Sequence, residues 1–330
     1  SGNTIYHWDP NTQQVSVFFS PSGGANGLVL DHEGNLLAAQ QNKRTVARIS
    51  NGVETTIAER YEGKRLNSPN DIVIKSDGNM FFTDPPYGVT KAQEELGFYG
   101  IYRLSPNGTL TLLDKTLKKP NGIVFSPDES KLYVSDTEER RVYVWDVLED
   151  ATLANRKEFA YMSPRGNADG MTVDEEGNLY CTGPIGIWIY AADGTILDTI
   201  PIPGQVTNCA FGGEDGKTLF VTAGSSLYKV SNAKVTTIQD RELDEFIPLE
   251  VNYPNPVTQQ VNIPVYLKEK QKVKLEIRDT KGETLALVAE QDLSEGRHHF
   301  VWNTQATAAG TYFVCLSYGE KMYSRAFVIE

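Results

Sequence analysis

One short phrase recurs five times in the first two thirds of the chain, and each copy opens on an amide or carboxylate side chain. An apolar run follows in each copy, then a polar turn and a second apolar run. Four amide oxygens and one carboxylate oxygen form a donor set that a hard divalent cation prefers. The alternative is that these residues only open strands, as turn residues often do. The opening residues are Asn26, Asn70, Asn121, Asp169 and Asn208.

The spacing of the phrase indicates the elements that position these side chains. The copies recur at intervals of roughly 40 to 50 residues, which is typical of β-propeller blades. Each unit supplies two apolar strands, a third strand with an aromatic residue and a more polar fourth strand. The first strand of a blade lines the central channel, so the five opening residues are expected to meet at one mouth.

The loops that follow the second strands are expected to open on the same mouth of the channel. Three of these loops begin near Asp84, Asp136 and Thr182. Asp84 is interpreted either as a lid carboxylate or as the cap of the turn before Pro85, and we favour the cap.

The N-terminal segment supplies only half a blade. Residues 4–8 are predicted to form a third strand and residues 15–19 a fourth, with the first two strands expected upstream of Ser1. Five units and this half predict an all-β, six-bladed β-propeller over residues 1–243, with its first blade incomplete in this chain. Helical periodicity is not sustained anywhere in the sequence.

The tail, residues 244–330, is predicted to be a small immunoglobulin-like β-sandwich. A proline-rich opening resists helix and central strand. Alternating apolar patterns then predict six strands. The expected strands cover 261–267, 273–279, 284–288, 299–302, 311–317 and 325–329.

The composition excludes some classes of partner. A net charge of −12 over 330 residues disfavours nucleic acid and anionic lipid surfaces, because both require a basic face. No apolar run is long enough to insert in a membrane. The scattered Cys181, Cys209 and Cys315 are expected to be buried free thiols, with a Cys181–Cys209 bridge as the alternative.

Several short sequence phrases, which match a known family in the same order, give the first 232 residues a specific resemblance. They are KRLNSPND at 64–71, FTDPPYG at 82–88, KPNGIVFSPD at 119–128, DGM at 169–171 and TNCAFGG at 207–213. This segment resembles the gluconolactonase, senescence-marker and luciferin-regenerating family. The resemblance implies a lactonase with one divalent metal in its channel. Asn121 and Asp169 correspond to metal ligands, and Asn70 to a residue that lies by the metal and contacts substrate.

The chain departs from the family at one ligand. The family has a Glu on the first strand of blade one, and this sequence lacks that strand. Either this ligand lies upstream of Ser1, which we favour, or the chain is a compromised enzyme. Ca²⁺ is the expected ion, with Mg²⁺, Mn²⁺ and Zn²⁺ as alternatives, since all accept oxygen ligands.

The implied reaction is metal-dependent hydrolysis of a sugar lactone to the aldonic acid, with water held by the metal attacking the lactone carbonyl. Asp169 is expected to act both as a ligand and as the general base. Arg65, Asn67, Tyr87 and Asn208 are weaker candidates for substrate contacts, and a surface salt bridge explains Arg65 equally well. The alternatives are a non-catalytic propeller that binds a sugar or a protein, and a phosphotriesterase-like hydrolase.

The tail carries its own set of phrases, YPNP at 253–256, DTKG at 279–282, GRHHFVW at 296–302 and AGTY at 309–312. They resemble the C-terminal sorting domain of type IX secretion, also called Por-type. The resemblance implies an exported protein, located in the periplasm, at the outer-membrane surface or outside the cell, with the secretion machinery as a partner. The alternative is an accessory sandwich without a sorting role.

Overall fold

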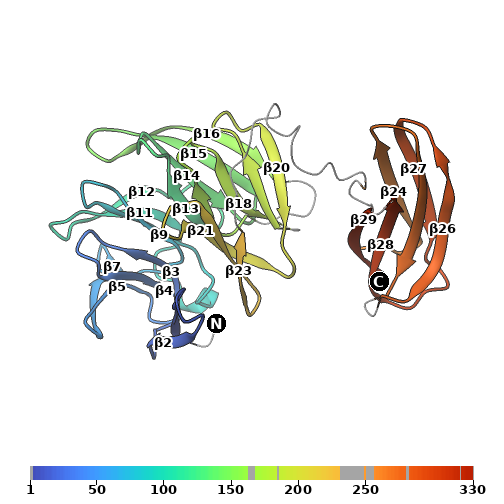
Figure 1. Cartoon of the computed structure of the whole chain (residues 1–330). Coiled ribbons are helices and arrows are strands. Elements are labelled where there is room, and N and C mark those ends of the chain that lie inside the picture. Colours follow the sequence, from blue (N-terminus) through green and yellow to red (C-terminus); the bar gives the residue numbers. More distant parts are fainter. Residues whose placement is uncertain are drawn as a thin grey trace. The chain divides into compact units, whose positions relative to one another are not determined.

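The computed structural model describes residues 3–162, 168–183, 186–230, 249, 256–279, 282–319 and 321–329. The chain divides into two compact units, Ser1–Val235 and Thr236–Glu330, which are drawn in Figure 1. The boundary expected between residues 243 and 244 lies outside the described residues. No helix in the described part of the chain is both long and apolar enough to cross a membrane.

The first unit consists of antiparallel sheets whose strands follow one another in chain order (Figure 1). The sheets are β1 (Ile5–Trp8) and β2 (Val15–Phe19); β3 (Ala25–Leu30), β4 (Leu36–Gln40), β5 (Thr45–Ser50) and β6 (Val53–Ala58); β9 (Ile72–Ile74), β10 (Met80–Asp84), β11 (Gly100–Leu104) and β12 (Leu110–Asp114); β13 (Pro120–Phe125), β14 (Lys131–Asp136), β15 (Arg141–Val147) and β16 (Leu153–Tyr161); β17 (Met171–Val173), β18 (Leu179–Gly183), β19 (Gly186–Tyr190) and β20 (Ile196–Pro201); and β21 (Val206–Gly212), β22 (Thr218–Ala223) and β23 (Ser226–Val230). A short hairpin, β7 (Arg60–Tyr61) and β8 (Lys64–Arg65), and a 3₁₀ turn, η1 (Lys91–Gln93), lie in the connections.

This arrangement confirms the all-β propeller architecture and the two strands of the N-terminal half blade. Each complete sheet has the predicted order, with the phrase at its first strand and the polar strand outermost. The number of six blades stays a prediction.

The apolar cores of the first unit lie between consecutive blades. One core packs Leu37 and Val46 of one sheet against Phe82 and Tyr102 of the next, and similar clusters join the later pairs of sheets. Cys181 and Cys209 are buried in two of these cores and are free thiols, as is the buried Cys315. The expectation of free thiols is therefore confirmed.

Small residues let the first strands approach one another closely at the channel. A Cβ atom at Gly122 would lie 2.1 Å from the carbonyl oxygen of Asp169 on the next blade. The Gly122 backbone N–H donates to that carbonyl at 3.2 Å, and Gly27 donates to the carbonyl of Asn70 in the same way. Gly27 and Gly122, which directly follow opening residues, thus serve close contact between blades rather than a turn.

The second unit is a sandwich of six described strands. They are β24 (Gln260–Leu267), β25 (Gln271–Arg278), β26 (Thr284–Leu293), β27 (Gly296–Asn303), β28 (Gly310–Tyr318) and β29 (Lys321–Ile329). One sheet has the order β26-β25-β28-β29 and the other pairs β24 with β27. Alternating side chains from both sheets, including Val261, Ile277 and Phe327, form one core. All six predicted strands are present, which confirms the predicted sandwich.

Candidate functional site

A cavity of about 710 Å³ opens where the first strands of the blades begin. Its walls come from the phrase openings and from the loops after the second strands, as the repeat predicts. Among the described residues that line it, one is a carboxylate, several are amides or hydroxyls, and none is cationic. The lining residues are Asn26, Gln41, Asn70, Tyr87, Asn121, Thr137, Asp169, Gly183, Gly204, Gln205 and Val206.

Asp169 is the charged group of this cavity. Burial raises the pKa of its carboxyl to about 6, and a hydrogen bond from the Asn121 side chain opposes this shift. The backbone of Asp169 is held on both sides: its N–H donates to Thr182 Oγ1 at 2.8 Å, and its carbonyl accepts from Ser135 Oγ at 3.1 Å. A desolvated carboxylate in a fixed position gains most from a bound cation, because burial penalises its unpaired charge.

Asn70 and Asn121 present amide groups to the same cavity. Asn70 is buried, and its Oδ1 atom has no hydrogen-bond partner within the described residues. The Asn121 Nδ2 atom donates to Thr137 Oγ1 at 3.0 Å and to Tyr87 Oη at 3.4 Å. An orphaned buried amide oxygen beside a desolvated carboxylate fits the oxygen-donor chemistry of a hard divalent cation.

This donor set contains fewer carboxylates than a dedicated cation cage. Across the described residues, no three His, Cys, Asp or Glu side chains gather where they could hold a metal ion. A cation at this site would therefore depend on the amide oxygens of Asn70 and Asn121 beside Asp169. The family resemblance implies a Glu as a further ligand, and no Glu is among the described residues that line the cavity.

A belt of hydroxyl groups supports the phrase openings from behind, and the sequence interpretation missed it. The hydroxyls stand at the next-to-last residue of four consecutive second strands and contact the backbone of the first strands. Thr83 Oγ1, for example, donates to the carbonyl of Asn121 at 2.7 Å. The recurrence at one strand position was the available signal. The belt residues are Thr83, Ser135, Thr182 and Thr222.

Asp71 forms a second buried carboxyl behind the cavity. Its side chain accepts the N–H groups of Ile72 at 3.0 Å and of Ile123 at 3.2 Å, so it joins the first strands of two blades. Burial raises its pKa to about 7, and the charge of Asp169 adds to the shift. Asp71 stands where other copies of the phrase have glycine, which explains why the motif varies at this position.

Asn208 lies one position away from its expected place in the repeat. Gly122 donates its N–H to the carbonyl of Asp169, but Gly170 donates to the carbonyl of Thr207 at 2.9 Å. Thr207 therefore occupies the opening position of the fifth copy. The Asn208 Oδ1 atom accepts the next backbone N–H at 2.8 Å, and the strand pairing shifts register at this point. Asn208 is absent from the cavity lining, which Gln205 and Val206 provide instead.

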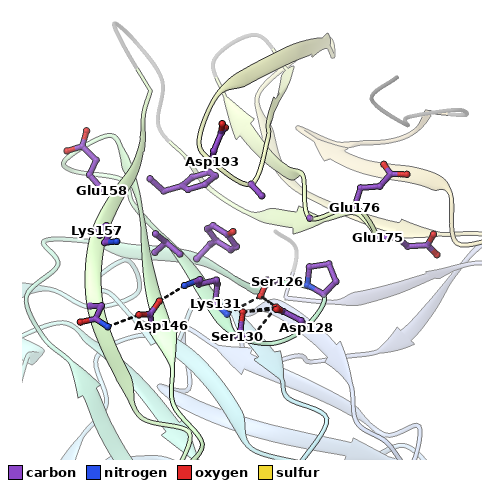
Figure 2. A pocket seen from close by; sticks show the side chains of 17 residues that line it. Ser126, Asp128, Ser130, Lys131, Asp146, Lys157, Glu158, Glu175, Glu176 and Asp193 are labelled. Carbon is purple, nitrogen blue, oxygen red and sulfur yellow. Dashed lines mark hydrogen bonds and ion pairs between the residues drawn. The ribbon is translucent and has the colours of Figure 1, made fainter. Parts of the chain in front are cut away.

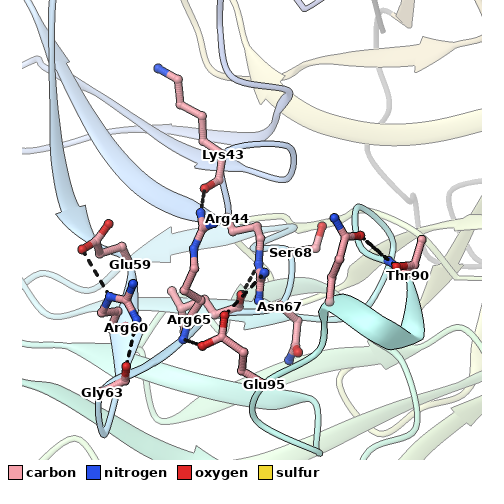
Figure 3. Close-up of polar contacts among 12 residues, drawn as sticks. Lys43, Arg44, Glu59, Arg60, Gly63, Arg65, Asn67, Ser68, Thr90 and Glu95 are labelled. Carbon is pink, nitrogen blue, oxygen red and sulfur yellow. Dashed lines mark hydrogen bonds and ion pairs between the residues drawn. The ribbon is translucent and has the colours of Figure 1, made fainter.

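Arg65 and Asn67 also lie outside the cavity lining. Figure 3 shows the polar contacts that they make instead. The Arg65 guanidinium donates to the carbonyl of Lys43 at 2.7 Å, and its backbone N–H donates to Glu95 at 2.9 Å. Asn67 is fully buried, and its Nδ2 donates to Asp84 and to the carbonyl of Phe98. Neither side chain reaches the place where a substrate would meet Asp169.

Asp84 belongs to this buried network rather than to a lid. Its carboxylate accepts the backbone N–H groups of Asn67 at 2.8 Å and Ser68 at 2.7 Å, so it holds the segment at residues 67–68, and the cap expected for the turn before Pro85 is not what these contacts show. Burial raises the pKa of Asp84 to about 7, although these N–H donors act against the shift. Tyr87, three residues further along, does line the cavity.

A second cavity of about 600 Å³ opens at the other ends of the strands, among the turns between first and second strands (Figure 2). Several of its carboxylates have partners within the chain. Asp128 accepts from Ser126 at 2.6 Å and from Ser130 at 2.8 Å, and Lys131 pairs with Asp146. These side chains stabilise their own turns and strand pairs, so the first cavity is the better candidate for chemistry.

The fold and the first cavity together define a β-propeller with an oxygen-lined channel site, in which Asp169 is the one carboxylate among the described lining residues. Residues 1–225 match the family model described as the SMP-30/Gluconolactonase/LRE-like region, and the chain belongs to this family. The resemblance inferred from the five phrases is confirmed.

Two curated relatives and one solved structure illustrate the family. A gluconolactonase of Zymomonas mobilis is 36% identical over 258 residues, covering 69% of this chain and 72% of the relative. The pentonolactonase XacC of Haloferax volcanii is 32% identical over 227 residues, covering 66% of this chain and 73% of the relative. The structure of XC5397 from Xanthomonas campestris, described as a gluconolactonase, has a TM-score of 0.65 at 34% identity, covering 69% of this chain and 78% of that one.

Residues 251–330 match the model of the secretion system C-terminal sorting domain. The sandwich is therefore a sorting domain, as its phrases predict, and the chain is an exported protein.

Proposed function

We propose that this protein hydrolyses the internal ester of a sugar lactone to give the open aldonic acid. The observation that carries the proposal is the position of Asp169, the one carboxylate among the described residues that line the cavity, beside the amides of Asn70 and Asn121. The gluconolactonase and pentonolactonase relatives support this class of substrate.

Asn70, Asn121 and Asp169 would hold a divalent cation, and Ca²⁺ is the ion we favour. Such an ion, when bound, supplies positive charge that polarises the lactone carbonyl. The orphaned Oδ1 of Asn70 supports this assignment, because a buried amide oxygen without a partner costs free energy until a ligand satisfies it.

The residues of the chain would carry the proton. Asp169 would accept a proton from the attacking water, and burial raises the pKa of its carboxyl to about 6 in the ion-free cavity. The water oxygen bonds to the carbonyl carbon, the bond from that carbon to the ring oxygen breaks, and the ring oxygen leaves as a hydroxyl after gaining a proton. The amide and hydroxyl groups of Gln41, Gln205 and Tyr87, which line the cavity, would bind the hydroxyls of a neutral sugar.

The test is hydrolysis of glucono-1,5-lactone and of a pentonolactone by the full chain, before and after EDTA. We expect turnover that EDTA removes and added divalent ions restore, and that Asp169→Ala lacks. Thr55→Val, an exposed change on the outermost strand β6, is the matched control. Sugar binding without turnover at any divalent ion would favour a binding propeller. Turnover of an organophosphate but of neither lactone would favour a phosphotriesterase.

We further propose that the secretion machinery recognises the sorting domain. Residues 256–279, 282–319 and 321–329 contribute the described part of this sandwich, and their match to the sorting-domain model supports the proposal. Removing residues 251–330 should leave the propeller inside the outer membrane. Export of the shortened chain to the cell surface would contradict this assignment.

A further inference from the structure

The backbone of Asp169 is hydrogen-bonded on both sides of its Cα atom. Its N–H donates to Thr182 Oγ1 at 2.8 Å, within its own blade. Its carbonyl oxygen accepts the hydroxyl of Ser135 at 3.1 Å and the N–H of Gly122 at 3.2 Å, both from the preceding blade. Because the peptide groups on both sides are held, the two side-chain torsions are what is left to move the carboxylate.

The preceding blade reaches the side chain of Asp169 as well. The Asn121 side chain, on β13, donates a hydrogen bond to its carboxylate. Gly122 on the same strand and Ser135 on β14 hold its carbonyl. The position of this carboxylate in the cavity therefore depends on the sheet that contains β13 and β14, and not only on its own blade.

Ser135 is well placed to hold a neighbour, because it lies in an anchored part of the strand. It is fully buried near the end of β14. The carboxylate of the next residue, Asp136, accepts the backbone N–H groups of Lys118 at 2.7 Å and Glu138 at 3.1 Å. These hydrogen bonds connect the end of β14 to the segment before β13 and to the loop that follows.

We propose that Ser135 is a positioning residue that holds Asp169 where it meets the ion and the substrate. This inference rests on the proposed function, because it requires that Asp169 acts as ligand and general base. Catalytic groups must lie within about 0.5 Å of their productive position. A displacement of about 1 Å can cost a factor of about 100 in rate. Ser135→Ala removes the hydroxyl donor and leaves the longer hydrogen bond from Gly122.

The experiment compares the full chain with Ser135→Ala in two measurements. One is kcat and KM for glucono-1,5-lactone at saturating Ca²⁺, and the other is the Ca²⁺ dissociation constant by calorimetry. We expect kcat to fall about tenfold and the dissociation constant to rise about tenfold. KM should stay within about twofold, because Ser135 is not among the described residues that line the cavity.

Two further variants show whether the hydroxyl itself is responsible. Ser135→Thr keeps the hydroxyl and should restore both values to within about threefold of the unmodified protein. Thr222→Val is the matched control, since Thr222 occupies the same position in its second strand. Its hydroxyl contacts Thr207 and the carbonyl of Asn208, which are not among the described lining residues, so both values should stay unchanged.

The outcomes separate this role from the function on which it rests. If the unmodified protein neither binds Ca²⁺ nor hydrolyses the lactone, the proposed function and the role of Ser135 both fail. If it does both, and a folded Ser135→Ala matches it in kcat and in Ca²⁺ affinity, only the role of Ser135 fails. Equal losses in Thr222→Val would also overturn that role. Thermal unfolding checks folding, and Ser135→Cys, whose thiol is a weak donor, replaces the alanine variant should that variant not fold.

Discussion

The carboxylates at the two ends of the propeller strands have pKa values that are shifted in opposite directions. At the turn end, Asp128 is exposed and its pKa is lowered to about 2 by hydrogen bonds from Ser126 and Ser130. At the cavity end, burial raises the pKa of Asp169 to about 6 and that of Asp71 to about 7. Carboxylates at one end thus stabilise the chain's own turns, whereas Asp169 at the other end is kept desolvated. A protein keeps such a group where a ligand or a reaction compensates its cost.

The largest expected difference between the two ends is in catalysis. Asp169→Asn should lower kcat/KM for a sugar lactone by about 10³-fold, because the amide cannot accept the proton of water. Asp128→Asn makes the same chemical change at the turn end and should leave kcat/KM unchanged. Initial rates with glucono-1,5-lactone measure both. Near-normal turnover by a folded Asp169→Asn would place the chemistry elsewhere.

Close packing of the first strands gives the next difference. Gly122→Ala should destabilise the protein by about 3 kcal/mol, since its Cβ would lie 2.1 Å from the carbonyl oxygen of Asp169 and the strands would have to separate. Gly212→Ala, on β21, is the control: its Cβ would meet only the ring of Phe220, at 3.2 Å. Urea denaturation measures both changes, and equal stability of the two variants would contradict this account of the glycines.

The pH dependence of stability should have opposite signs at the two ends in the EDTA-treated protein. The pKa of Asp169 is raised from 3.8 to about 6, so its contribution to stability is present at low pH and is lost as the pH rises through 6. The loss is about 3 kcal/mol, at 1.36 kcal/mol for each pKa unit. At pH 8, ion-free Asp169→Asn should therefore be more stable than the unmodified protein, with no such gain at pH 3.

The pKa of Asp128 is lowered, so its stabilising contribution is present above pH 4 and is lost as the pH falls toward 2. Asp128→Asn should accordingly weaken the protein at neutral pH and make little difference at pH 2. Urea denaturation at pH 3, 5 and 8 measures the Asp169 effect, and a point at pH 2 completes the Asp128 curve. Parallel curves for the two variants would mean that the two ends do not differ in this way.

Much of this arrangement follows from the repeat in the sequence. The strand order, the mouth at which the phrase openings meet and the loops that join them depend on local patterns that recur from blade to blade. The cavity brings Asn70, Asn121, Asp169 and Tyr87 together as those patterns predict. Their catalytic and binding roles stay predictions.

The remaining features depend on contacts between different segments of the chain, which the repeated sequence phrase did not predict. Asn208 has the residue type of an opening position, but the backbone N–H of Gly170 donates to the carbonyl of Thr207, one residue earlier. Asn67 shares a phrase with Asn70, yet its amide nitrogen donates to Asp84 and to a carbonyl 31 residues away. Thr137 lies outside the repeated phrase, so only its hydrogen bonds reveal its place.

The smallest expected effect compares two hydroxyls that accept from the same Asn121 nitrogen. Tyr87 Oη lies 3.4 Å from Nδ2, whereas Thr137 Oγ1 lies 3.0 Å away. The longer hydrogen bond contributes less, at the low end of about 0.5–1.5 kcal/mol, so Tyr87→Phe should weaken Ca²⁺ binding only about threefold. Tyr161→Phe, an exposed tyrosine at the end of β16, is the control. A loss in Tyr87→Phe of about tenfold or more would mean that Tyr87 holds the amide strongly, and that the loop after β10 takes part in forming the ion site.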